Sequence, residues 1–211
     1  MKRTLLSLAL LALPAAAQPR LFYSKSFPGS VPAYVEITLE RDGLAVYKES
    51  PTDDQPLRLK LKQDEVDAIF ALAETLGHFK TTLESGLPVA RMGDKTFRWE
   101  DGAEKSEQKF NYSQNVNAQA LQDWFEKITE SEQRLFQLQN TARFDKLGVD
   151  KALLLLEAAW DKKRLVALDQ FYPWLNRVAK NDAYLNMARE RAARLLETFQ
   201  NPRPTAEKEK K

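Results

Sequence analysis

The chain has 211 residues, with 32 Lys and Arg against 30 Asp and Glu, and it contains no Cys. The lack of Cys excludes disulfides, thiolate chemistry and lipid attachment to a cysteine. The balanced charge gives no one-sign patch of the kind that binds phosphate backbones. We therefore expect neither nucleic acid nor an anionic membrane surface as a partner.

The chain begins with a segment typical of a secretory leader. Lys2 and Arg3 give it a positive start, residues 4–13 form an apolar run, and small residues end it at Ala17. The run is about half the length that a helix needs to cross roughly 30 Å of hydrocarbon, and Pro14 ends it. We therefore predict cleavage after Ala17 and an exported protein, periplasmic or secreted, with no stable membrane insertion.

From residue 21 to residue 112, apolar and polar residues mostly alternate with the period of β-strands. Asp-Gly pairs at 42–43 and 101–102 predict hairpin turns, because glycine accepts a positive φ without strain. Strands are expected at residues 21–23, 35–39, 44–48, 57–61, 96–100 and 108–112. These runs predict five or six mostly antiparallel strands.

A helix interrupts this pattern. The apolar residues between Val66 and Leu76 recur at helical spacing, and Gly77 follows where a left-handed C-terminal cap is expected. Such a helix would bury its apolar stripe on the sheet. Strands packed by helices predict an α+β layer fold for residues 18–130.

From residue 131 to residue 201 we expect only helices, as an all-α C-terminal extension. One helix is predicted from about Asn117 to Lys146, with a single polar interruption of its apolar stripe at Glu132. At about 45 Å it is longer than a compact domain needs. Its second half is therefore expected to leave the sheet.

Further helices follow in a small bundle. Asp150 is expected to cap one helix, residues 168–180 form another, and Asp182 is expected to open a last one that ends near Phe199. Residues 202–211 read as a disordered, charged tail, because they are rich in charge and poor in apolar residues.

Two of these predicted helices resemble one helical pair of the HEAT or armadillo type. The resemblance rests on Leu168 to Phe199, with Pro173, Asn181-Asp182, Ala188, Arg191, Ala192 and Leu196. It implies a protein-binding solenoid only where several such units stack, and at most one and a half are found here. An ordinary pair of bundle helices is the favoured alternative.

No stretch of the sequence has the spacing of a catalytic, metal or cofactor motif, so we expect no catalytic residues, no metal and no cofactor. His78 is the only histidine and lacks a second His or Cys to share a zinc ion. Asp53-Asp54 is the nearest acidic loop, and a solvated turn explains it. Ser85-Gly86 lacks the flanking glycines of a nucleophile elbow.

Aromatic residues are the remaining candidates for a binding surface. Tyr172, Trp174 and Trp99 are the candidate partner-binding residues, with core packing as the alternative for each. We expect a monomeric or weakly associating, non-catalytic module that binds another exported protein or an envelope component. The alternative is a carboxylate-dependent hydrolase. A deep pocket with two carboxylates, one of raised pKa, would favour the enzyme, and a flat apolar patch would favour the binder.

The leader generates the first prediction. Cleavage after Ala17 leaves Gln18 as the mature N-terminus, with or without cyclisation to pyroglutamate. Intact-mass spectrometry of the exported protein measures this directly. A mass that still includes residues 1–17 would contradict the assignment.

Overall fold

A computed structural model describes residues 18–201; the predicted leader at 1–17 and tail at 202–211 lie outside the described residues. The N-terminal half is a six-stranded sheet with the order β4-β3-β2-β1-β5-β6, and all neighbouring strands are antiparallel. Its strands are β1 (Arg20–Ser26), β2 (Tyr34–Glu40), β3 (Leu44–Lys48), β4 (Leu57–Lys60), β5 (Asp94–Asp101) and β6 (Glu104–Phe110).

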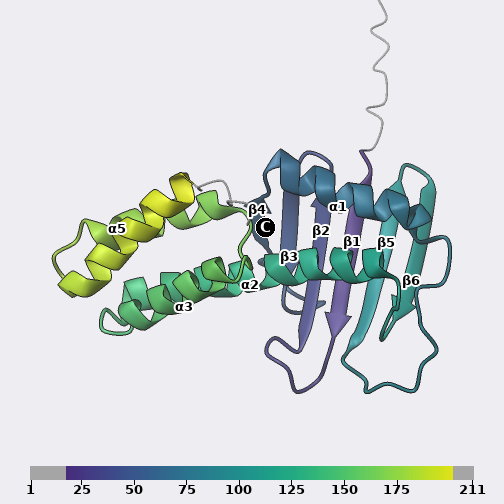
Figure 1. Ribbon diagram of the computed structural model, residues 1–211, viewed down its shortest axis with the longest axis horizontal. Helices are drawn as coiled ribbons and strands as arrows, with labels where there is room; N and C mark the ends of the chain where they lie inside the picture. Colours follow the sequence, from purple (N-terminus) through teal and green to yellow (C-terminus); the bar gives the residue numbers. More distant parts are fainter. Residues whose placement is uncertain (1–17, 202–211) are drawn as a thin grey trace, which may run out of the picture.

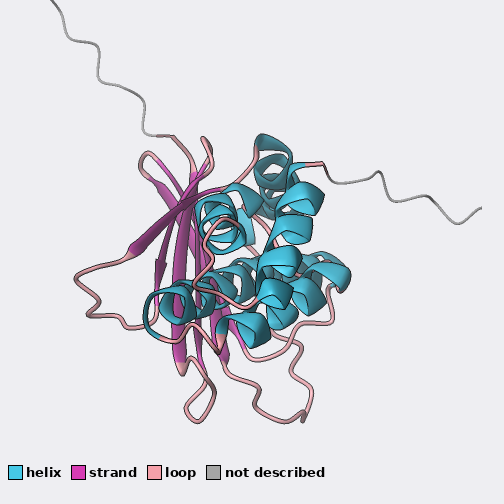
Figure 2. Cartoon of the chain, turned by 90° about the vertical axis from the view of Figure 1, so that its left-hand side faces the viewer, coloured by secondary structure: helices cyan, strands magenta, loops and turns pink. Residues whose placement is uncertain are grey.

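Helices cover one face of this sheet and continue beyond it. They are α1 (Gln63–Thr75), α2 (Val116–Phe144), α3 (Val149–Asp161), α4 (Tyr172–Ala179) and α5 (Asn186–Gln200), with short 3-10 helices η1 (Gly77–Phe79) and η2 (Leu168–Phe171). Helices α1 and α2 cross the strands, and α2 extends past β4 toward α3 and α5 (Figure 1). Seen along its edge, the sheet has all helices on one side (Figure 2). This arrangement confirms the predicted α+β fold.

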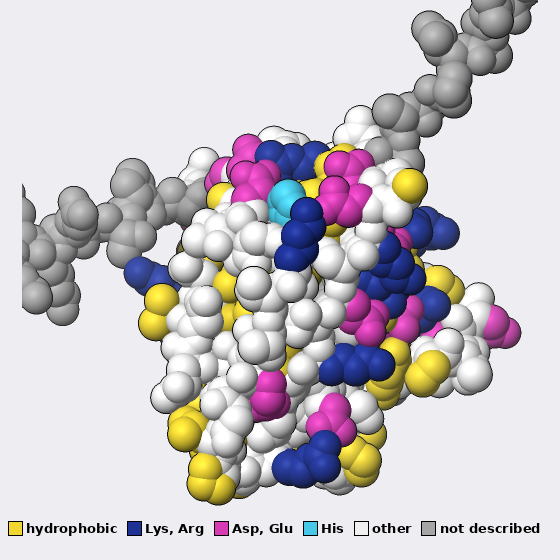
Figure 3. Space-filling view, turned by 90° about the vertical axis from the view of Figure 1, so that its right-hand side faces the viewer, with side chains coloured by type: hydrophobic (Ala, Val, Ile, Leu, Met, Phe, Trp, Pro, Cys, Tyr) yellow, Lys and Arg dark blue, Asp and Glu magenta, His cyan; other side chains and the backbone are white. Residues whose placement is uncertain are grey.

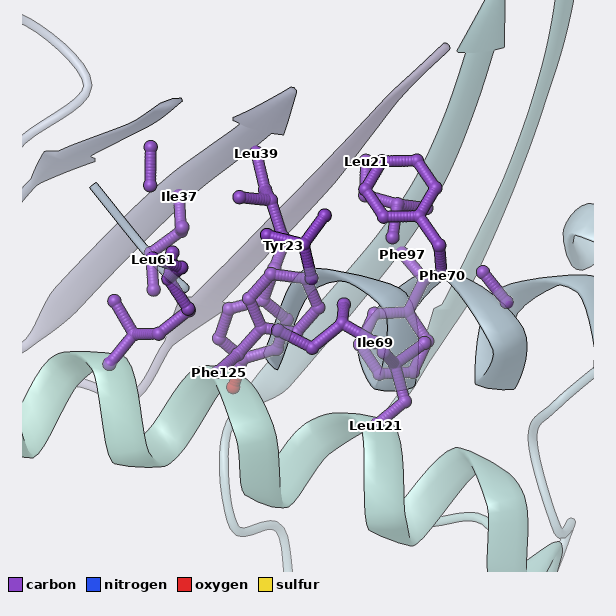
Figure 4. Packing of buried hydrophobic residues seen from close by; sticks show 14 of the residues in the cluster. Leu21, Tyr23, Ile37, Leu39, Leu61, Ile69, Phe70, Phe97, Leu121 and Phe125 are labelled. Atoms are coloured by element: carbon purple, nitrogen blue, oxygen red, sulfur yellow. The ribbon is translucent and has the colours of Figure 1, made fainter. Parts of the chain in front are cut away.

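The first core lies between the sheet and helices α1 and α2, as Figure 4 shows. Phe125 of α2 stacks on Tyr23 of β1 with ring centroids 4.7 Å apart. Phe97 of β5 lies 6.0 Å from the same Phe125 ring, and Leu121 and Ile69 close the cluster from the helices. All of these side chains are buried. Alternation along the strands places them on one face of the sheet, and helical spacing places their partners on the sides of α1 and α2 that pack against that face.

A second core begins where α2 leaves the sheet. It contains Leu135 and Leu138 of α2 and the apolar stripes of α3, η2, α4 and α5. The buried Tyr184 hydroxyl donates a hydrogen bond of 2.7 Å to the Ala142 carbonyl, which ties the α4–α5 turn to the end of α2. Helix α2 is thus continuous through both cores, and the expected boundary near residue 130 falls inside it.

The segment after α3 fastens the second core to the first. Arg164 pairs with Glu130 at 3.0 Å and also with Asp123, both on α2. The Val166 amide donates to Ser131 Oγ at 2.9 Å, and Val166 itself is buried in the first core. The chain therefore returns from the bundle to the sheet before it forms α4.

The hairpin and helix-end predictions hold at two glycines. Gly43 has φ +91°, and a Cβ there would lie 2.8 Å from the Leu61 carbonyl oxygen, so the turn leaves no room for a side chain. Gly77, after α1, has φ +59°, the left-handed conformation expected of a helix end.

The predictions for two helix starts are wrong. Helix α3 begins before Asp150, which lies in the first turn and pairs with Arg191 of α5. Helix α5 begins after Asp182, whose carboxylate instead bonds Arg189 at 2.7 Å. An acidic residue is favourable anywhere near a helix N-terminus. The sequence therefore predicts the region where a helix begins more reliably than it predicts which residue caps the helix.

The sheet face away from the helices carries its own polar network. The Arg98 guanidinium lies 3.8 Å from the Phe22 ring centroid and pairs with Glu100 at 2.9 Å and Glu107 at 3.2 Å. These contacts, which cross from β5 to β1 at Phe22 and to β6 at Glu107, cover apolar surface with charge, so the face is not an apolar patch. Among the described residues, no helix is long and apolar enough to cross a membrane.

The first core predicts a large cost for truncating Phe125. Phe125→Ala should lower the free energy of unfolding by about 3–5 kcal/mol, because the side chain is 1% exposed and its removal leaves a cavity beside Tyr23. Denaturant unfolding monitored by circular dichroism measures the difference. Phe136→Ala on the same helix is the control, since Phe136 is 60% exposed and should change stability little. Equal effects for the two variants would mean that Phe125 does not support the core.

Candidate functional site

The three predicted partner-binding aromatics do not lie together. Trp99 is 4% exposed and packs in the first core, where its ring stacks on His78 at 4.0 Å. Tyr172 and Trp174 are half-buried against the second core. A partner could reach little of Trp99, so the prediction of an aromatic contact now rests on Tyr172 and Trp174.

Both remaining aromatics are already engaged within the bundle. The Tyr172 hydroxyl donates a 3.0 Å hydrogen bond to the Phe199 carbonyl. The Trp174 ring lies close to two guanidinium groups, with its centroid 4.8 Å from that of Arg143 on α2 and 5.7 Å from that of Arg177 on α4. The Tyr172 hydrogen bond links α4 to α5, and the Arg143 contact links α4 to α2.

His78 lies at the β6 edge of the sheet. Figure 3 shows this edge, where the histidine reaches the surface among side chains of both charges. Lys80 and Glu104 form an ion pair of 2.7 Å nearby. The Ser106 hydroxyl donates to the His78 backbone carbonyl and not to the imidazole, whose ring is packed on Trp99, so packing explains the position of His78.

A groove lies instead where the β3–β4 loop approaches the middle of α2. We call it the junction groove. Its volume is about 480 Å³, and its lining residues are Val31, Tyr47, Glu49, Asp53, Gln55, Leu57, Glu132, Gln133 and Phe136. They come from the β1–β2 hairpin, from β3, from the β3–β4 loop, from β4 and from α2. The groove therefore sits at the point where α2 passes from one core to the other.

The rim of the junction groove is apolar and exposed. Val31 is 93% exposed, Phe136 60% and Leu57 45%. Large apolar side chains this open to water raise the free energy of the unbound surface, and their clustering in a concave site is typical of a binding surface.

The floor contains a buried carboxyl group. Glu132 is only 3% exposed, yet its Oε1 has no hydrogen-bond partner in the structure. The Gln170 side chain of η2 lies near the carboxyl and partly opposes the effect of burial, but its own Nε2 is also left without a hydrogen bond. Burial raises the pKa of Glu132 to about 7, because the charged form loses its hydration.

The other carboxylates of the junction groove are held by local bonds. Glu49 accepts a 2.7 Å hydrogen bond from the Tyr47 hydroxyl, and the Asp53 carboxylate accepts one of 2.9 Å from the Gln55 backbone N–H. No lining residue is basic. The groove is thus acidic at its floor and sides and apolar at its rim.

The hairpin tip between β1 and β2 divides the junction groove from a smaller hollow. Gln133 Nε2 donates a 3.3 Å hydrogen bond to the Val31 carbonyl and lines both spaces, as Val31 does. The smaller hollow measures about 280 Å³ and includes Lys25, Glu126 and Arg134. Its charges are of both signs, in contrast to the junction groove.

One other buried charge belongs to the structure rather than to a site. Lys95 is 3% exposed, and its Nζ donates hydrogen bonds to the carbonyls of Gly93 at 3.1 Å and Asn111 at 2.7 Å. Burial lowers the pKa of its ammonium group. With both carbonyls satisfied by Lys95, this side chain fastens the loop before β5 to the segment after β6.

Within residues 18–201 no group of three or more His, Asp or Glu side chains is placed to hold a metal ion. No protein-family model and no curated protein matches this chain. Function must therefore be argued from the junction groove itself.

Glu132 generates a prediction about pH. Its folded pKa of about 7 lies above the ordinary 4.5, so folding favours the protonated form and stability is lost as the pH rises from about 4.5 through 7. Glu132→Gln should remove this loss and raise the free energy of unfolding at pH 8 by about 3 kcal/mol relative to its effect at pH 4.5. Urea unfolding at pH 4.5, 6 and 8 measures the trend.

Glu74→Gln on α1 is the matched control, because it makes the same substitution at a carboxylate that is exposed to water. It should leave the pH profile of the unmodified protein unchanged. A Glu132→Gln profile parallel to that of the unmodified protein would show that Glu132 titrates normally.

Proposed function

We propose that the protein is an exported, non-catalytic binding module and that the junction groove is its contact surface for another exported protein or an envelope component. The observation that carries this proposal is the combination of an exposed apolar rim with a buried, unpartnered acceptor in one groove. The leader sequence supports export.

Other exposed apolar residues make a weaker case. Phe144 and Leu147 lie near the α2–α3 turn, and Leu185 and Met187 near the α4–α5 turn, all of them exposed. Arg191 Nε of α5 is buried without a hydrogen bond, but it lies 3.2 Å from the Glu157 carboxylate, so its charge is compensated. Single exposed apolar residues are common on soluble proteins, whereas apolar residues around a vacant acceptor suggest a specific ligand.

A carboxylate-dependent hydrolase is the second candidate. It is favoured by the raised pKa of Glu132 in a groove that also holds Glu49 and Asp53, since an acid of raised pKa beside an ionised carboxylate is the arrangement of many glycosidases. Against it, the Glu49 carboxylate is bonded by Tyr47, and the rim is open to water. Hydrolysis of envelope polysaccharide that stops in Glu132→Gln would replace the binding proposal.

The binding proposal predicts that the rim residues hold the partner. The double variant Leu57→Ala/Phe136→Ala should lose an envelope component that the unmodified mature protein retains on an affinity resin, because truncating a central apolar anchor often costs roughly 2 kcal/mol or more. Phe144→Ala/Leu154→Ala removes apolar groups of comparable exposure elsewhere and should retain it. Quantitative mass spectrometry of the eluates measures how much of the component each variant retains relative to the unmodified protein.

The bundle aromatics are tested in the same experiment. Tyr172→Ala and Trp174→Ala are compared after circular dichroism has shown that each variant folds. Loss of the component in these folded variants, with full retention by Leu57→Ala/Phe136→Ala, would place the contact on α4 and overturn the assignment to the junction groove.

A further inference from the structure

The junction groove has a chemistry that selects its occupant. We propose that it binds a basic side chain, Arg or Lys, together with a neighbouring apolar residue in an exposed segment of the partner protein. The inference rests on the proposed function, since it names the kind of segment that the same groove would hold. Three features of the groove carry it.

The first feature is charge. Glu49, Asp53 and Glu132 line the junction groove, and none of its lining residues is Lys or Arg. Elsewhere on the same helix, carboxylates do have cationic partners: Glu130 pairs with Arg164 at 3.0 Å, and Glu126 with Lys25 at 3.5 Å. The groove thus gathers negative charge without a counterion from the described chain, and a cation is the complementary ligand.

The second feature is the vacant acceptor. Glu132 Oε1 is buried and has no donor, although a buried carboxylate oxygen normally accepts a hydrogen bond. A guanidinium or ammonium group supplies both the missing donor and the compensating charge, and charge-assisted bonds of this kind are among the stronger ones. A neutral or anionic ligand would supply at most one of the two.

The third feature is the apolar rim. Phe136, Leu57 and Val31 are exposed around the acidic floor, so an occupant that reaches Glu132 passes between apolar side chains. The alkyl stem of Arg or Lys and an adjacent apolar residue would cover this rim while the charged end reaches the floor. Free cations without an apolar part would leave the rim in water.

A protein segment fits better than a small free amine. The rim is open, and a second hollow of about 280 Å³ lies on the other side of the Val31–Gln133 contact. An extended segment can cross this contact and place one side chain in each space, whereas a small amine would occupy only the junction groove. The mixed charges of Lys25, Glu126 and Arg134 in the second hollow suit a polar residue of such a segment.

The buried carboxyl also sets a pH signature. Tyr47 of β3 and Gln170 of η2 are the polar groups that interact with Glu132, and Glu49 and Asp53 of the β3–β4 loop line the same groove. With a pKa of about 7, Glu132 is mostly protonated at pH 6 and mostly ionised at pH 8, so a cation that needs the ionised form should bind about tenfold more tightly at pH 8. The sole histidine is stacked on Trp99 of β5, near the edge of the sheet away from β3 and β4, too far from the junction groove to produce this change.

The experiment uses a short Gly-Ser peptide that carries phenylalanine followed by arginine at its centre. Isothermal titration calorimetry with the full mature protein should show binding that is about tenfold tighter at pH 8 than at pH 6. A peptide with citrulline in place of arginine keeps the shape without the charge and should bind at least tenfold more weakly at pH 8. Alanine in place of phenylalanine should also weaken binding, because the rim is then left uncovered.

Variants of the protein assign the effect to the junction groove. Glu132→Gln should weaken binding of the arginine peptide at pH 8 at least tenfold and abolish its pH dependence, and Phe136→Ala should weaken binding while keeping that dependence. Glu74→Gln is the control and should bind as the unmodified protein does. Equal affinity for the arginine and citrulline peptides, or unchanged binding by Glu132→Gln, would overturn the inference.

Further outcomes distinguish a free amine from a protein segment as the source of the cation, and distinguish failure of this inference from failure of the proposed binding function. If 2-phenylethylammonium binds as tightly as the peptide, the groove takes free amines and the assignment to a protein segment is wrong. If no basic peptide binds, but an envelope component is retained through Leu57 and Phe136, the binding function stands and the choice of a cation fails. If neither is observed, both proposals fail.

Discussion

A helix of 29 residues is about 44 Å long, whereas six strands span only about 24 Å across a sheet, so α2 cannot bury its whole apolar stripe on the strands that it crosses. Its first half packs Leu121, Phe125 and Ile128 on the sheet, and its second half needs another apolar surface for Leu135 and Leu138. The bundle of α3, α4 and α5 supplies that surface. The second core is therefore a consequence of the length of one helix.

The position between these two cores is where the helix carries Glu132. Helical spacing puts this residue on the same stripe as Ile128 and Leu135, so its carboxyl is drawn into apolar surroundings with both neighbours. The returning chain contacts α2 just before Glu132, through Arg164 with Glu130 and through the Val166 amide with Ser131, and these contacts join the two cores. The α2 wall of the groove is thus held by the same contacts that join the cores, and the β1–β2 hairpin and the β3–β4 loop complete the groove against it.

Local patterns in the sequence were enough to predict the sheet, the left-handed turn at Gly77 and the departure of α2 from the strands, because hydrophobic period and turn chemistry act over a few residues. They also showed the polar interruption at Glu132, but not its surroundings. Those depend on contacts such as Gln133 with Val31, which are 102 residues apart, and periodicity carries no information about them. The aromatic residues were a poor guide for the opposite reason: Trp99 is large enough to dominate a core, and it is buried there.

The buried carboxyl links stability to binding. Ionisation of Glu132 in apolar surroundings costs about 3 kcal/mol at pH 8, a cost that remains although the nearby Gln170 side chain opposes part of the effect of burial, and Oε1 accepts no hydrogen bond from the described chain. A cation in the junction groove would offset it by lowering the pKa of Glu132, so the free energy that weakens the empty protein becomes part of the affinity for its ligand. Glutamine at the same position would give a more stable protein that has lost this source of affinity. The proposed cation would thus give a function to a carboxyl whose burial the packing of the two cores does not explain.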